Sequence, residues 1–164
     1  MKMDERSTTQ EVRLALPEDR EGIVSLTRLL HDENGLFALA PTKVEVMLDR
    51  FYKREGAIIG VIGDVGAPVA VIYLSIHQPI YTNDWVLGEE FNFVHPDHRR
   101  TRHARNLIAY AKHLSDEAEL PFVIGILSNQ RTEAKIRLYE QVLEKAGAFF
   151  VYNRKYAGGS AWGK

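Results

Sequence analysis

One segment limits the fold of this chain more than any other: a strand, a charged turn, an amphipathic helix and a second strand follow one another directly. Residues 85–94 read as a strand that ends in Phe93 and Val94. Apolar residues at helical spacing predict a helix over about 103–118, and the apolar run 122–127 predicts the next strand. If these two strands are parallel neighbours, the crossover between them is right-handed, which indicates an α/β protein.

The remaining segments extend this unit in both directions. Alternating or continuous apolar runs predict further strands at 12–16, 57–63, 68–76 and 148–156. Helices are predicted from Pro17 to about Leu30, over 42–51 with Thr42 as N-cap, and over about 131–146 with Gly147 as the stop, with a loop at 31–41. The order β-α-α-β-β-β-α-β-α-β favours a mixed sheet with helices on both faces.

Composition limits the chemistry. The chain has 164 residues, a formal net charge of -1 and no cysteine, which excludes disulfides, thiolate metal sites and a cysteine nucleophile. We expect a single domain over residues 11–156 with flexible termini at 1–10 and 157–164. The start of the chain lacks the apolar run of a signal peptide, and no run is long enough to span a bilayer, so we expect a cytoplasmic protein.

The turn at residues 95–105 carries an unusual set of charges. It holds four arginines and three histidines against one aspartate, and it opens a helix. The free N–H groups of a helix start bind anions, so a diphosphate fits this geometry. A solvated surface turn is an equal alternative, and nucleic acid is disfavoured because the chain is not basic. The histidines His95, His98 and His103 lack partners at metal-ligand spacing, so no metal is expected.

The same residues carry a family resemblance. Val94, Pro96, Arg99 and Ala104 are spaced as in the acetyl-coenzyme A motif of the GNAT acetyltransferase superfamily, which the run from Trp85 to Ala104 resembles. The resemblance extends over nearly the whole chain and implies a GNAT-like acyl-CoA N-acyltransferase fold. One position departs from the pattern, because Arg102 stands where the family has glycine. Its side chain either leaves the backbone N–H groups open or blocks the site.

The resemblance also implies which residues hold the coenzyme. Backbone groups of Phe93 and Val94 would hold the pantetheine arm of acetyl-CoA, the cosubstrate. The turn that follows would cradle the diphosphate, and it consists of Arg99, Arg100, Thr101, Arg102, His103 and Ala104. Asn129 matches the asparagine that family members place at the end of the next strand.

Two catalytic roles are implied by the resemblance. A glutamate on the strand would act as general base, and strand alternation places Glu90 on the same face as Asn92, although a bulge would favour Glu89 instead. Tyr139 would act as the acid that protonates the leaving thiolate. If the helix is realigned on its C-terminal residues, Leu143 takes that place and the acid is lost. Ordinary strand-edge charges and a core tyrosine are the corresponding structural alternatives.

The predicted function is N-acetyl transfer from acetyl-CoA to an amine by direct attack, in a small-molecule or peptide acceptor. Acidic residues at 84, 89 and 90 favour a cationic acceptor such as a polyamine, an aminoglycoside or lysine, and the loops 31–41 and 78–84 would border its pocket. Neither a membrane nor nucleic acid is expected as a partner, and a homodimer is compatible with the resemblance. The alternative is a degenerate module that binds CoA, a nucleotide or nucleic acid without turnover.

Overall fold

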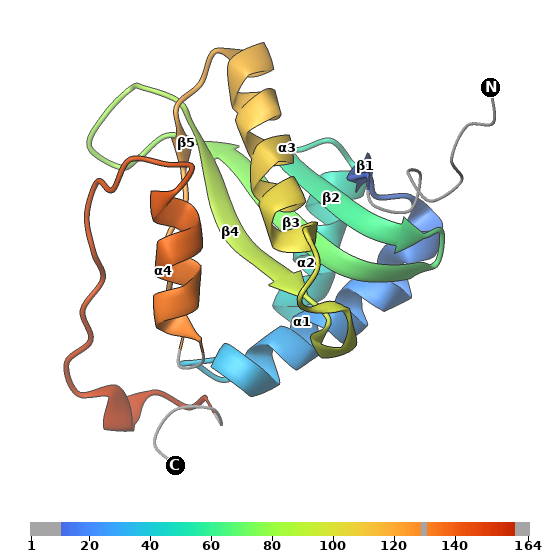
Figure 1. Ribbon diagram of the computed structural model, residues 1–164, viewed down its shortest axis with the longest axis horizontal. Helices are drawn as coiled ribbons and strands as arrows, with labels where there is room; N and C mark the ends of the chain where they lie inside the picture. Colours follow the sequence, from blue (N-terminus) through green and yellow to red (C-terminus); the bar gives the residue numbers. More distant parts are fainter. Residues whose placement is uncertain (1–10, 129–130, 160–164) are drawn as a thin grey trace.

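Within the residues that the computed structural model describes, 11–128 and 131–159, the chain forms one five-stranded mixed sheet (Figure 1). The strands are β1 (Arg13–Leu14), β2 (Ala57–Asp64), β3 (Ala67–His77), β4 (Val86–Val94) and β5 (Phe122–Val123), and they lie in that order. All neighbours are antiparallel except β4 and β5, which are parallel. The α-helices are α1 (Arg20–Asn34), α2 (Pro41–Tyr52), α3 (His103–Ala118) and α4 (Thr132–Glu140), and 3-10 turns lie at Pro17–Asp19, Pro96–His98 and Arg154–Tyr156. None of these helices is long and apolar enough to cross a bilayer.

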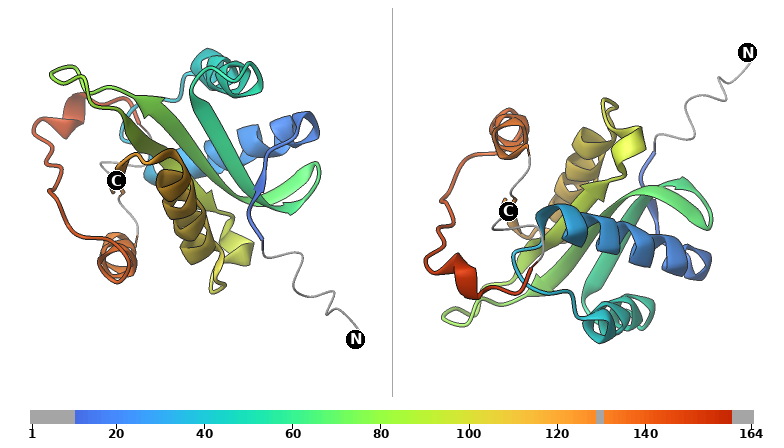
Figure 2. Two further views of the ribbon diagram at one scale, coloured as in Figure 1. Left: turned by 90° about the horizontal axis from the view of Figure 1, so that it is seen from above. Right: turned by 90° about the horizontal axis from the view of Figure 1, so that it is seen from below.

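Helices cover both faces of the sheet, as the sequence predicts (Figure 2). On one face, α1 and α2 bury Ile23 and Leu48 against strand residues such as Val71. On the other face, α3 buries Leu107 against Ile72 in a second core. Burying one such side chain stabilises the fold by about 1.5–3 kcal/mol, so the amphipathic patterns of the helices decide which way each one faces.

Strand β4 contains one extra residue relative to β3. The pairing shifts between Tyr73, which faces Phe91, and Leu74, which faces Glu89. Glu90 therefore has no partner position on β3, which is the arrangement of a β-bulge. Side chains on the two sides of such a bulge no longer follow a common alternation.

The burial pattern confirms this change of face. Leu87 and Phe93 are six residues apart and would share a face in a regular strand. Instead, Leu87 packs in the core beneath α3, whereas Phe93 packs in the core beneath α1 and α2. Both side chains are at least 95% buried, so the packing of each core requires the bulge between them.

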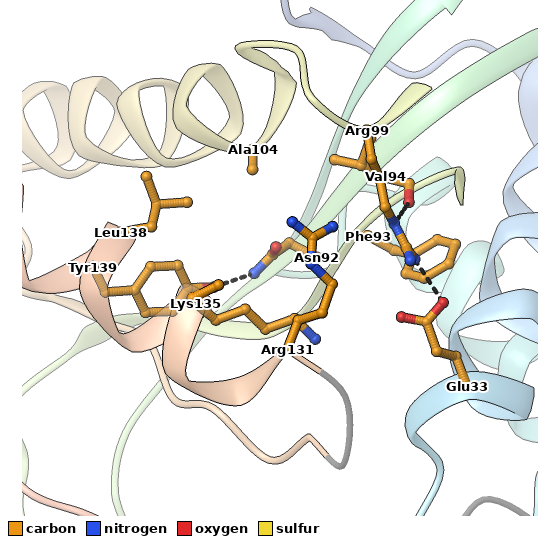
Figure 3. A pocket seen from close by; sticks show the side chains of 11 residues that line it. Glu33, Asn92, Phe93, Val94, Arg99, Ala104, Arg131, Lys135, Leu138 and Tyr139 are labelled. Atoms are coloured by element: carbon orange, nitrogen blue, oxygen red, sulfur yellow. Dashed lines mark hydrogen bonds and ion pairs between the residues drawn. The ribbon is translucent and has the colours of Figure 1, made fainter. Parts of the chain in front are cut away.

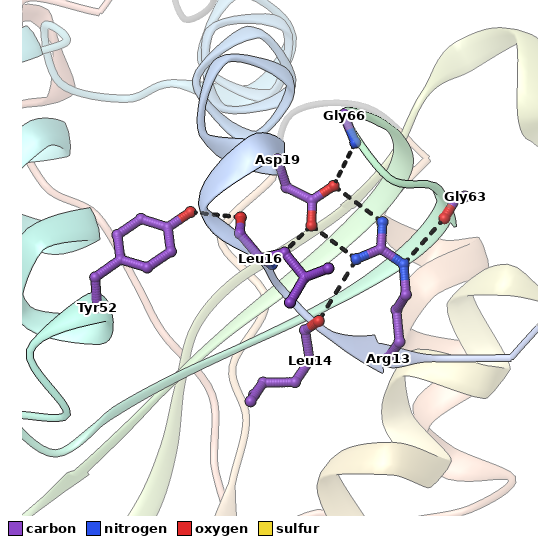
Figure 4. Close-up of polar contacts among 7 residues, drawn as sticks. All are labelled: Arg13, Leu14, Leu16, Asp19, Tyr52, Gly63 and Gly66. Atoms are coloured by element: carbon purple, nitrogen blue, oxygen red, sulfur yellow. Dashed lines mark hydrogen bonds and ion pairs between the residues drawn. The ribbon is translucent and has the colours of Figure 1, made fainter.

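A buried carboxylate fixes the start of α1 to the sheet (Figure 4). Asp19 has no exposed surface, and it accepts two hydrogen bonds from the Arg13 guanidinium at 2.7 and 2.9 Å. It also accepts from the backbone N–H of Leu16 at 2.8 Å and from that of Gly66 at 2.9 Å. Gly66 has φ +80° in the β2–β3 turn, a conformation that glycine adopts without strain. One carboxylate thus connects β1, α1 and the hairpin.

The N-terminal half differs from the prediction at two helix ends. The first helix continues to Asn34, so the predicted loop 31–41 is shorter than expected. The second begins at Pro41 with Ala40 as N-cap, so Thr42 is not the cap. Proline is well suited to a first helical position because its missing N–H would have no helical acceptor there.

The C-terminal third differs more. The helix α4 ends at Glu140 rather than near 146, so Gly147 is not its stop, and the predicted strand 122–127 pairs only over Phe122–Val123. The predicted strand 148–156 is wrong, because this segment pairs with no strand among the described residues. Its Phe150 is 93% exposed. Residues 1–10 and 160–164 of the predicted flexible termini lie outside the described residues, whereas the Gly159 N–H donates to the Leu36 carbonyl at 3.0 Å.

Candidate active site

The parallel strands β4 and β5 separate after a short contact. They pair only where Leu87 faces Phe122 and Gly88 faces Val123, while β4 continues to Val94. A cavity of about 150 Å³ lies beside the unpaired part of β4 (Figure 3). Residues from four parts of the chain line it: Glu33, Asn92, Phe93, Val94, Arg99, Ala104, Arg131, Ala134, Lys135, Leu138 and Tyr139. The predicted pantetheine residues Phe93 and Val94 therefore border a cavity beside the part of β4 that β5 does not pair with.

The start of α3 meets the same cavity. The first hydrogen bond into the helix runs from Asn106 N to Arg102 O at 2.9 Å, and His103 N donates to Thr101 Oγ1 at 3.2 Å. The Ala104 N–H lies between them in the first turn, where a helix offers no acceptor. Since Ala104 lines the cavity, this amide and the positive end of the helix dipole lie at its rim.

Arg102 does not fill the cavity. Its side chain is exposed and is absent from the lining residues. Its backbone has φ -87° and ψ 4°, which any L-residue adopts, so this position does not need glycine for conformational reasons. Instead, Arg100 takes the left-handed conformation in this turn, with φ +66°.

The Arg99 side chain makes contacts within the protein. Its Nη2 lies 2.6 Å from Glu33 Oε2, and its Nε donates to the Val94 carbonyl at 3.3 Å. The guanidinium also lies over the Phe93 ring, 5.4 Å from the ring centre. Arg99 therefore connects the end of α1 to the end of β4. These hydrogen bonds use Nε and Nη2, and a guanidinium has five N–H donors, so others remain for the predicted contact with a coenzyme phosphate.

Asn92 connects the two candidate catalytic groups. Its Nδ2 donates to Glu89 Oε1 and to the Tyr139 hydroxyl, both at 2.8 Å. An amide nitrogen carries two hydrogens, so one serves each partner. Because the Tyr139 oxygen accepts from Asn92, its own hydrogen is available for donation elsewhere.

Burial sets the protonation states of these groups. It raises the pKa of Glu89 to about 7, and the charge of Glu90 adds to the effect, whereas hydrogen bonds from Asn92 and the Gly125 N–H oppose it. Burial, followed by the charge of Glu89, raises the pKa of Tyr139 above its ordinary range. Near neutral pH, Glu89 can accept a proton and Tyr139 holds one, which are the states of a general base and a general acid.

The alternation argument that selected Glu90 is wrong at the bulge. Glu90 is exposed and accepts a hydrogen bond from Ser75 Oγ, so it lies on the α1–α2 side of the sheet. Glu89 instead shares the side of Asn92. In a regular strand, Glu89 would lie on the apolar face with Phe91 and Phe93, and this conflict was the available sequence signal.

The other sequence predictions have separate outcomes. Tyr139 lies on α4 and lines the cavity, whereas Leu143 follows the end of that helix, so the realignment on Leu143 is wrong. Asn129 lies outside the described residues. His103 is buried. Across residues 11–128 and 131–159, no group of three or more potential ligands is placed to hold a metal ion.

Sequence reasoning missed several lining residues, of which Lys135 is the most notable. Lys135 and Tyr139 are four residues apart on α4, so both project from one face of the helix toward the cavity. The Lys135 Nζ donates to Ser128 Oγ at 2.8 Å. Their helical spacing was visible in the sequence, but it indicates a functional face only once the position of α4 is known.

Comparison with solved structures finds acetyltransferases. An aminoglycoside 6'-N-acetyltransferase of Acinetobacter haemolyticus aligns with a TM-score of 0.66 and 14% identity, over 87% of this chain and 95% of that chain. A ribosomal-protein-alanine N-acetyltransferase of Brucella melitensis biovar Abortus 2308 aligns with a TM-score of 0.66 and 19% identity, over 87% and 97%. An aminoglycoside N-acetyltransferase in complex with the bisubstrate analogue CoA-S-monomethyl-acetylneamine aligns with a TM-score of 0.69 and 15% identity, over 87% and 96%. The sequence itself matches no family model and no curated protein.

Proposed function

We propose that this chain, which has the fold of the GNAT acetyltransferases, transfers an acetyl group from acetyl-CoA to a primary amine. The observation that carries the proposal is the Asn92 amide, which lines the cavity beside β4 and donates hydrogen bonds to both Glu89 and Tyr139. A base that ionises near neutral pH and a protonated phenol are the two groups that direct acyl transfer to an amine requires.

The residues around the cavity fit the cosubstrate. Phe93 and Val94 line the cavity where β4 no longer pairs with β5, and this edge of β4 would hold an extended pantetheine arm. The Ala104 N–H and the helix dipole at the start of α3 suit a diphosphate. A volume of about 150 Å³ suits the acetyl and thioester end of the cosubstrate, and the remainder would follow the surface of the turn. The exposed Arg102 leaves this path open.

The chain would then contribute two proton transfers. Glu89, directly or through water, removes the proton that the amine loses as it attacks the thioester carbonyl. Tyr139, whose oxygen already accepts from Asn92, directs its hydrogen toward the departing thiolate. Backbone N–H groups at the edge of β4 would stabilise the oxyanion that forms between these steps.

The charged residues that line the cavity indicate what charge the acceptor amine can carry. The residues that line the cavity include one acidic residue, Glu33, and three basic ones, Arg99, Arg131 and Lys135. The cationic acceptor that the acidic residues at 84, 89 and 90 favoured therefore gains no support from the cavity. We propose a primary amine in a small molecule or peptide without a high positive charge.

A thiol-release assay with a panel of primary amines tests the proposal. Glu89→Gln and Tyr139→Phe are each expected to lower kcat/KM by about 10²–10⁴-fold, the usual contribution of general acid–base catalysis. The matched variant Glu90→Gln removes the neighbouring carboxylate and should lose far less. A larger loss of kcat/KM in Glu90→Gln than in Glu89→Gln would identify Glu90 as the general base, as strand alternation predicts.

Calorimetric titration with acetyl-CoA tests the step before catalysis. If the chain does not bind acetyl-CoA at high micromolar concentration, the enzyme proposal is refuted. If it binds CoA but no amine in the panel releases thiol, the non-catalytic module is favoured instead. A steep loss of oligonucleotide affinity with salt would identify nucleic acid as its ligand.

A further inference from the structure

Lys135 occupies a position that the proposed reaction does not use. It projects from α4 into the cavity, and Figure 3 shows its side chain extended across the cavity past Asn92. Its Nζ is anchored by the 2.8 Å hydrogen bond to Ser128 Oγ. Tyr139 lies one helical turn away on the same face. A primary amine is thus fixed at the cavity that Asn92 and Tyr139 also line, and Asn92 is hydrogen-bonded to Glu89.

Burial is the largest influence on the protonation of Lys135 and favours the neutral amine. Burial lowers the pKa of Lys135, and the charges of Arg99 and Arg131 lower it further, whereas the charges of Glu33 and Glu89 oppose this. These groups come from α1, from β4, from the turn before α3 and from the residue before α4. The neutral amine is the nucleophilic form, so the electrostatic surroundings act in the direction that acylation needs.

We infer that Lys135 is itself an acetylation site, modified by the acetyl-CoA that occupies the cavity beside it. This inference rests on the proposed function, because it requires the thioester to lie at the edge of β4. Exposed lysines such as Lys43 on α2 lack both the enclosure and the acid–base pair.

The step balances without any further reactant. The Nζ lone pair attacks the thioester carbonyl carbon, a C–N bond forms and the C–S bond breaks. The thiolate leaves as free coenzyme A after it takes a proton from Tyr139. The proton that Nζ loses passes to Glu89, directly or through water. The product is N-acetyl-lysine, which carries no charge and fills part of the space that an acceptor would use.

Site-resolved mass spectrometry tests this inference on the full chain. The protein is incubated with isotopically labelled acetyl-CoA, and acetylation is followed over time at Lys135 and at Lys43. We expect Lys135 to be modified at least about tenfold faster than Lys43, because a fixed amine reacts at high effective concentration. Tyr139→Phe should slow Lys135 by about tenfold or more while leaving Lys43 unchanged. Lys135→Arg should abolish the fast label, whereas Lys43→Arg should retain it.

Three results would overturn the inference. In a protein that binds acetyl-CoA by calorimetry, equal rates at Lys135 and Lys43 would exclude self-acetylation and leave the proposed enzyme function intact. A wild-type rate at Lys135 in Tyr139→Phe would show that the modification does not use the proposed acid and is non-enzymatic. Failure to bind acetyl-CoA would remove both proposals together. The first comparison uses the wild-type chain, so it stands even if Lys135→Arg fails to fold.

Discussion

Replacing Asn92 with alanine should raise the pH at which the enzyme becomes active. In the wild type, kcat/KM should rise with pH through about 7, because Glu89 must lose its proton to act as a base. Asn92 donates a hydrogen bond that favours the ionised carboxylate. Without this bond, the carboxylate holds its proton to a higher pH, so the midpoint of the profile moves upward.

The size of the shift follows from the contacts of Glu89. A hydrogen bond to a charged group contributes about 1.5–3 kcal/mol, and one pKa unit corresponds to about 1.36 kcal/mol. Loss of the Asn92 bond should therefore raise the midpoint by about one to two units. The Gly125 N–H remains in place and limits the shift. Asn92→Ala should also lower the plateau rate, since Tyr139 loses the donor that orients its hydroxyl.

The assay is thiol release at low acceptor concentration across roughly pH 5–10, a range that covers the wild-type midpoint and the higher one expected for Asn92→Ala. The midpoint is fitted for each variant. Glu90→Gln is the matched control with the opposite sign, because the charge of Glu90 raises the pKa of Glu89 and its removal should lower the midpoint. An Asn92→Ala profile with the wild-type midpoint would refute the assignment of Glu89 as the group that controls activity.

Four further predictions concern stability and the turn. Asp19→Ala should lower the free energy of unfolding in urea by about 3–5 kcal/mol, since it leaves the Arg13 charge and two backbone N–H groups without their acceptor, whereas the exposed Glu18→Ala should change it little. Burial raises the pKa of Asp19, but its hydrogen bonds outweigh this effect and hold the pKa below its ordinary value of 3.8. The wild type should therefore lose this stabilisation in an acid titration below about pH 4, whereas Asp19→Ala should show no such loss. A double-mutant cycle of Glu33→Ala and Arg99→Ala should give a coupling energy of about 1–3 kcal/mol in unfolding, and an additive result would contradict the ion pair. Arg102→Gly should leave the Kd for acetyl-CoA within about threefold of wild type, and a much tighter complex would indicate that the arginine obstructs the site.

Local patterns were sufficient to predict the sheet and three of the helices. The helix predicted over 103–118 agrees with α3, because the face on which its apolar residues lie is also the face that packs against the strands. The hairpin of β2 and β3 likewise follows from two apolar runs joined at a glycine-containing turn. In these elements, the local preference and the long-range packing coincide.

The C-terminal third could not be predicted in the same way, because its residues gain little from packing. Beyond Glu140 the chain is mostly exposed, so helical spacing alone does not continue α4 toward residue 146. The segment 148–152 has high strand propensity, yet β5 pairs over only two residues and offers it no regular edge. Strand propensity needs a hydrogen-bonding neighbour, and this information is absent from a local window.

The candidate site was predicted only in part, for a related reason. Tyr139 and the strand end at Val94 were chosen from the family resemblance, and both line the cavity. The choice between the two glutamates depended on how β4 pairs with β3, which is a property of two segments together. Lys135 and Glu33 gain meaning only when α4 and α1 meet at one cavity.

The bulge in β4 makes the position of Glu89 a by-product of hydrophobic packing. Leu87 anchors one end of the strand in one core and Phe93 anchors the other end in the opposite core, so neither half can slide without exposing a large side chain. Deleting residue 90 would straighten the strand and force one of these anchors into water. Selection that preserves the two cores therefore also preserves the side of the sheet on which the Glu89 carboxylate lies. Substitutions at Leu87 should impair activity, although this side chain does not line the cavity.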